Sequence, residues 1–100
     1  MRPGSRDVKV RILITGEEFT ELKKYTYMMV EAFGLDSRFE RYQGTRPIGL
    51  YRWDLDCLID VIAVAVRDSE NEADTTEGGR RALRRLHERL QDEYRSTFGN

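Results

Sequence analysis

The stretch that decides the fold is DLDCLIDVIAVAV, residues 54–66. Two interpretations compete, because residues 61–66 are also rich in the β-branched residues that favour a strand. The helical interpretation accounts for the first half as well, since aspartates are favoured in the first turn by the helix dipole. One apolar face then follows helical spacing, through Leu55, Leu58, Ile59, Ile62 and Val66. We therefore predict a helix at about 54–67.

This predicted helix carries a second apolar stripe, formed by Cys57, Val61 and Val64. A helix that is apolar on two sides must be covered on both. Either the helix is central in its domain, or another chain covers the stripe. A chain of 100 residues offers few elements for that purpose, so we expect a homodimer whose isologous interface contains these three residues.

The segments before this helix predict two short strands and a helix. Residues 8–14 alternate between apolar and polar side chains, which is typical of a half-buried strand. Thr15-Gly16-Glu17-Glu18 matches a capping box, followed by a helix to about residue 33. Residues 35–43 suggest a short helical turn with Asp36 as its cap, and 48–52 a second short strand. The repeated strand–helix order suggests two βα units, whose strands would be parallel if they shared a sheet.

The C-terminal third predicts a linker and a last helix. Residues 67–77 are acidic and lack large apolar side chains, so we expect a mobile linker. A helix at about 78–95 follows, with a narrow seam of Leu83, Leu86, Leu90 and Tyr94. We expect residues 1–7 to be flexible and 8–100 to form one α+β domain. In that domain, three amphipathic helices pack on one or two short strands.

Composition narrows the function classes. The chain has one cysteine and a formal net charge of −1, which excludes a disulfide framework and a globally basic surface. No apolar run approaches the roughly 20 residues of a membrane span. We expect a small cytoplasmic protein without a cofactor.

The sequence offers little for catalysis or metal binding. Cys57 lies among apolar and acidic residues, which disfavour a reactive thiolate. Asp56 and Asp60 share a helix face without a histidine at helical spacing, and His87 lies beside the leucine seam. These last three residues are the best candidates for an active site, and we predict no catalytic or metal site. The leading hypothesis is a non-enzymatic protein-interaction or assembly module that acts as a homodimer.

The alternative hypothesis is a nucleic-acid-associated protein. Residues 38–53 mix arginines with aromatic residues, the combination that contacts phosphates and stacks on bases. The candidate contacts in this segment are Arg46, Tyr51, Arg52 and Trp53. An arginine-rich helix at 80–89 adds Arg80, Arg81, Arg84 and Arg85. The near-zero net charge speaks against this alternative, because proteins that bind nucleic acid through a basic face usually carry an excess of positive charge.

Overall fold

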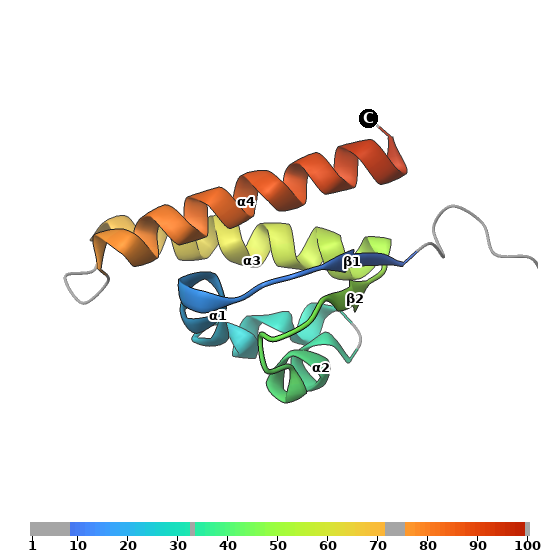
Figure 1. Cartoon of the computed structure of the whole chain (residues 1–100), viewed down its shortest axis with the longest axis horizontal. Helices are drawn as coiled ribbons and strands as arrows, with labels where there is room; N and C mark the ends of the chain where they lie inside the picture. Colours follow the sequence, from blue (N-terminus) through green and yellow to red (C-terminus); the bar gives the residue numbers. More distant parts are fainter. Residues whose placement is uncertain (1–8, 33, 72–75, 100) are drawn as a thin grey trace, which may run out of the picture.

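A computed structural model describes residues 9–32, 34–71 and 76–99. The elements along the chain are β1 (Val10–Ile12), α1 (Gly16–Lys23), the 3-10 helix η2 (Thr26–Glu31), α2 (Leu35–Arg41), β2 (Ile48–Leu50), α3 (Arg52–Asn71) and α4 (Glu77–Phe98). The long helices α3 and α4 pack along one another, and the shorter elements lie to one side of them (Figure 1). This is the predicted α+β class, with four α-helices in the described ranges where we predicted three.

The helix α3 confirms the helical interpretation of residues 54–66. It also runs on to Asn71, so the prediction of a linker beginning at residue 67 was wrong. The continuation is held by Ser69, whose hydroxyl donates to the Val66 carbonyl, while Arg80 Nε of α4 donates to the Ser69 carbonyl at 2.8 Å. Residues 72–75 of the predicted linker and the predicted flexible segment 1–7 lie outside the described residues.

The predicted helix at 17–33 is two elements. The helix α1 ends at Lys23, and η2 begins three residues later. The hydroxyl of Thr26 donates to the Lys23 carbonyl at 2.8 Å. This side-chain bond satisfies an acceptor that a continued helix would pair with a backbone N–H. The Lys23 ammonium donates to carbonyls at the end of α2, the nearest being that of Glu40 at 3.1 Å. The break allows η2 to pack against α3.

The two strands form an antiparallel ribbon in which Val10 pairs with Leu50 and Ile12 with Ile48. The expectation of a parallel pair was wrong, because three helical segments separate the strands in place of one βα crossover. As a result, β2 begins at the end of the ribbon where β1 stops (Figure 1). Val10, Ile12, Ile48 and Leu50 face the core, so Lys9, Arg11 and Gly49 lie on the other face of the pleat.

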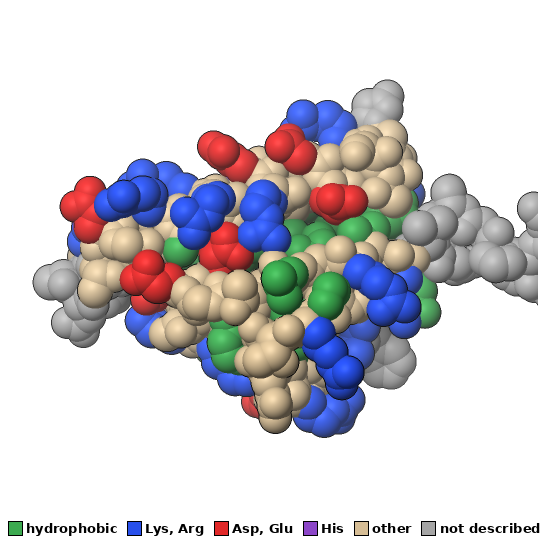
Figure 2. Space-filling model, viewed as in Figure 1, with side chains coloured by type: hydrophobic (Ala, Val, Ile, Leu, Met, Phe, Trp, Pro, Cys, Tyr) green, Lys and Arg blue, Asp and Glu red, His purple; other side chains and the backbone are tan. Residues whose placement is uncertain are grey.

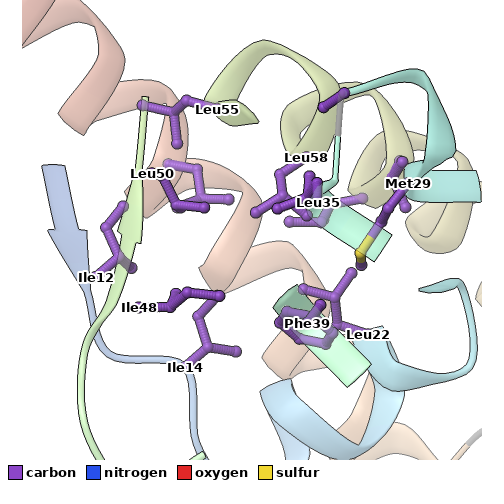
Figure 3. Close-up of a cluster of buried hydrophobic side chains, with 14 of the residues drawn as sticks. Ile12, Ile14, Leu22, Met29, Leu35, Phe39, Ile48, Leu50, Leu55 and Leu58 are labelled. Carbon is purple, nitrogen blue, oxygen red and sulfur yellow. The ribbon is translucent and has the colours of Figure 1, made fainter. Parts of the chain in front are cut away.

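One hydrophobic cluster joins the strands and helices. Figure 3 shows Ile12 and Ile48 of the ribbon near Ile14, with Leu22, Phe39 and Met29 from α1, α2 and η2. The predicted seam of α4 closes this cluster through Leu86 and Leu90, and Leu83 of the same seam is also fully buried. Within the described ranges, no helix is both long enough and apolar enough to cross a lipid bilayer.

Candidate functional site

The stripe predicted as a dimer interface is mostly covered by other parts of the same chain. Val61, its central residue, is only 3% exposed, and Cys57 and Val64 are half-buried. The segment η2 packs against α3, and its Met29 belongs to the same core cluster as Val61. Val61 is therefore a core residue of a single chain, contrary to its predicted place on an interface.

The most exposed large apolar side chains among the described residues lie on η2 instead. Tyr27 is 70% exposed and Val30 is 61% exposed. Helical spacing puts Tyr27 on the polar face of the predicted helix and Val30 on its apolar face, so only the exposure of Val30 departs from that prediction.

The arginines of α4 are engaged within the chain. Arg80 is bonded to the Ser69 carbonyl at the end of α3, Arg81 lies 4.0 Å from Glu77, and Arg84 lies 3.7 Å from Glu70. Arg85 belongs to a tighter group with Glu18. These four predicted nucleic-acid contacts therefore have intramolecular partners, which explains how an arginine-rich turn is tolerated near a helix N-terminus.

Glu18 of α1 is the anchor of that group. Its carboxylate accepts from Arg85 Nε at 3.2 Å and from Arg89 Nη1 at 2.7 Å, and the carboxylate is almost fully buried. Arg89 Nη2 also donates to the Leu13 carbonyl at 2.7 Å. Figure 2 shows red side chains among the blue ones on this face of the molecule. The predicted capping box is absent, since Thr15 makes no side-chain cap bond.

The residues considered for catalysis do not assemble into a described metal site. Asp56 and Asp60 lie on the exposed side of α3, while His87 is half-buried on α4. In the described ranges, no group of three or more His, Cys, Asp or Glu residues could hold a metal ion.

A cationic–aromatic corner, formed by Lys9, Tyr51, Arg52 and Trp53, lies where β2 leads into α3. The rings of Tyr51 and Trp53 stack with centroids 4.9 Å apart, and the Lys9 ammonium lies 5.2 Å from the Tyr51 centroid. Trp53 remains 45% exposed. Arg52 turns toward α4, where its Nε donates to the Tyr94 hydroxyl at 2.9 Å. This hydrogen bond raises the pKa of Arg52, so its guanidinium stays charged.

A buried carboxylate fixes the backbone of this corner. The Tyr51 N–H donates to Asp54 Oδ2 at 2.9 Å, which caps the start of α3. Arg38 of α2 forms an ion pair with the same oxygen and donates to the Gly49 carbonyl at 3.2 Å. Asp54 is fully buried, so α2, β2 and α3 are tied together at one point.

An arginine hollow opens beside the ribbon, with a volume of about 420 Å³. It is lined by Arg38, Arg41, Tyr42, Gln43, Thr45, Arg46, Pro47, Ile48 and Gly49. Among the described residues, no carboxylate belongs to this lining. Arg41 and Arg46 are exposed, and neither forms an ion pair with any described residue. The arrangement suits an anion, because unpaired guanidinium groups present several donors in a fixed fork.

The hollow and the corner meet at Gly49. This residue lines the hollow, and a Cβ placed on it would lie only 2.5 Å from Lys9 Cδ. The Lys9 side chain therefore crosses Gly49 on its way to the Tyr51 ring. A side chain at position 49 would force the Lys9 side chain to shift, so Gly49 is the point at which the hollow and the corner adjoin.

The sequence found part of this face. Arg46, Tyr51 and Trp53 were predicted and do lie on it, whereas Arg52 is turned toward Tyr94. Lys9 and Arg41 were missed as contacts. Strand alternation does place Lys9 on the face opposite the buried Val10, but it does not indicate the contact with Tyr51, and only the return of the chain through α2 brings Arg41 beside the ribbon.

Fold and site together define a small α+β protein with a cationic–aromatic face along a short β-ribbon. No protein-family model, no curated protein and no solved structure matches the chain.

Proposed function

We propose that this protein is a non-enzymatic nucleic-acid-binding protein that takes a single strand along the outer face of β2. The observation that carries the proposal is the meeting at Gly49 of a carboxylate-free arginine hollow with an exposed aromatic stack. The hollow offers charge for phosphates, and the corner offers a ring surface for a base.

The aromatic stack favours single strands over duplexes. A base can stack on Trp53 only if it is free of its neighbours in a duplex. Trp53 is held in position by Tyr51, so little conformational freedom is lost when a base adds to the stack. Stacking of this kind contributes about 1–3 kcal/mol per base.

The net charge of −1 does not oppose this proposal, because charge is unevenly distributed: Arg41 and Arg46 of the hollow have no described acidic partner, whereas the buried carboxylates do have partners. Glu18 is occupied by Arg85 and Arg89, and Asp54 by Arg38. A local field at the ribbon can therefore be positive while the chain as a whole is near neutral.

Trp53 is the only tryptophan, so its fluorescence reports directly on the proposed contact. We expect quenching when a single-stranded oligonucleotide of about 10 nucleotides is added at low salt. Replacing Trp53 with alanine should weaken binding about tenfold when binding is followed by anisotropy of a labelled strand.

The matched control is Arg67→Gln, which removes an exposed arginine from the other end of α3. Arg46→Gln makes the same change of charge in the hollow. Equal losses from the two arginine variants would show that binding is non-specific, and the absence of quenching at low salt would refute the proposal.

A second candidate function is assembly as a homodimer, favoured by the exposure of Tyr27 and Val30 on η2. Tyrosine is enriched in the buried centres of protein interfaces. Sedimentation equilibrium at roughly micromolar to tens of micromolar concentration tests this candidate directly. A dimer that Val30→Glu converts to a folded monomer would support it, and a monomeric wild-type protein would refute it.

A further inference from the structure

We infer that the arginine hollow is a site for the terminal phosphate of a single strand, so that the protein prefers a phosphorylated strand end to an internal position. This inference rests on the proposed function and adds to it the part of the ligand that the hollow recognises.

The charge of the hollow matches a phosphomonoester. Arg38, Arg41 and Arg46 supply three positive charges, and Asp54 behind Arg38 removes one. A terminal phosphate carries about −1.5 to −2 at neutral pH and has three strongly accepting oxygens. An internal phosphodiester carries a single negative charge, so it would leave part of the positive charge unneutralised.

The donors around the hollow also suit a phosphate group. The fork of a guanidinium matches two phosphate oxygens at once, and Arg41 and Arg46 are free to turn inward because no described carboxylate holds them. Thr45 and Gln43 add polar side chains to the lining. The neighbouring hollow of α1 and α2 shares Arg41 but includes Glu40, so it is the poorer site for an anion.

The Arg38 guanidinium is held in place before any ligand binds. It is fixed by Asp54 on one side and by the Gly49 carbonyl on the other. A fixed charge loses little entropy on binding, which favours affinity.

The neighbourhood of the hollow favours a strand end over other phosphorylated molecules. Gly49 lines the hollow, and the Lys9 side chain passes over Gly49 toward the stacked rings of Tyr51 and Trp53. A phosphate in the hollow therefore leaves the next part of the ligand beside a cation and an aromatic stack. A nucleoside supplies the planar base that such a stack accepts.

The experiment compares three strands of one sequence: 5′-phosphorylated, 3′-phosphorylated and without a terminal phosphate. We expect one phosphorylated form to bind about tenfold or more tightly than the unphosphorylated strand. Inorganic phosphate should compete more strongly with the preferred strand than with the unphosphorylated strand, whose internal phosphates gain less from the hollow. Arg41→Gln and Arg46→Gln should each reduce the preference to below about threefold, while Arg67→Gln retains it. Thermal melting checks that these surface variants stay folded.

Three other results would overturn the inference, and each has a different consequence for the proposed function. Equal affinity for all three strands refutes the terminal-phosphate site and leaves the proposed function intact. Absence of binding by any strand refutes both. A phosphoserine peptide without aromatic residues that binds as tightly as the preferred strand assigns the hollow to phosphoproteins and refutes the strand end as its ligand.

Discussion

At the scale of single residues, Arg38 and Asp54 form the contact on which the ribbon corner depends. The carboxylate is fully buried, and its two described partners are the Arg38 guanidinium and the Tyr51 N–H. Replacing Arg38 with leucine leaves a buried charge without its counterion. We expect the free energy of unfolding to fall by about 3 kcal/mol, measured by urea denaturation.

The control for this prediction is Arg67→Leu, which removes an exposed arginine and should change stability by less than about 0.5 kcal/mol. A similar small change for Arg38→Leu would show that water replaces the ion pair without loss.

Two adjacent glycines give a second prediction at this scale. A Cβ on either glycine would come within 2.8 Å of a glutamate carboxylate oxygen. Glu17, beside Gly78, is exposed and can move away, whereas Glu21, beside Gly79, is largely buried and also brings its Cγ to 3.2 Å. Alanine favours a helix over glycine by up to about 1 kcal/mol, but overpacking costs about 1–3 kcal/mol. Gly78→Ala should therefore raise the melting temperature, and Gly79→Ala should lower it. Shifts of the same sign and size would contradict the close approach.

At the scale of elements, Glu18 links α1 to α4. Glu18→Gln keeps the shape of the side chain but removes the charge that Arg85 and Arg89 contact. Because both arginines are partly exposed, solvent screening reduces the expected loss to about 1–2 kcal/mol. Chemical denaturation measures it, with the exposed Glu17→Gln as the control. Equal effects of the two variants would contradict a special role for Glu18.

The packing of η2 on α3 gives another prediction at this scale. Val61→Glu should unfold the chain, because it buries a charge in the core of a single chain. The same substitution at the exposed Val30 should leave the circular dichroism spectrum and melting cooperativity unchanged. A folded, soluble Val61→Glu protein would show that Val61 is not a core residue and would support its predicted place in a dimer interface.

At the scale of the whole molecule, the distribution of paired and unpaired charge matters more than the total. On α4, Arg81, Arg84, Arg85 and Arg89 are paired with acidic groups. In the hollow beside the ribbon, Arg41 and Arg46 have no described acidic partner. Binding of a single strand should therefore be salt-dependent even though the chain has a net charge of −1.

The size of this salt effect is a further prediction. Each phosphate contact contributes about −0.7 to the slope of log affinity against log salt for a single strand. Arg46→Gln should make the slope less steep by about that amount, as measured by anisotropy titrations at several salt concentrations. A slope that Arg46→Gln leaves unchanged would show that this arginine does not contact a phosphate.

The sequence by itself determined the α+β class, the helical state of residues 54–66 and the leucine seam of α4. These properties follow from hydrophobic periodicity, which acts within one element. The break after Lys23 involves the Lys23 ammonium, which donates to the Glu40 carbonyl 17 residues further along the chain. The antiparallel pairing depended on the path of the chain through the three helical segments between the strands. Periodicity holds no information about such partners.

The same distinction applies to the site. The sequence identified Arg46, Tyr51 and Trp53 by residue type, but it treated the arginines of α4 as equally available. Only the tertiary structure decided which cations are neutralised, because an ion pair such as Glu18 with Arg89 joins residues 71 positions apart. It also decided that Val61 lies in the core, since η2 folds back against α3 along a path that no local pattern specifies.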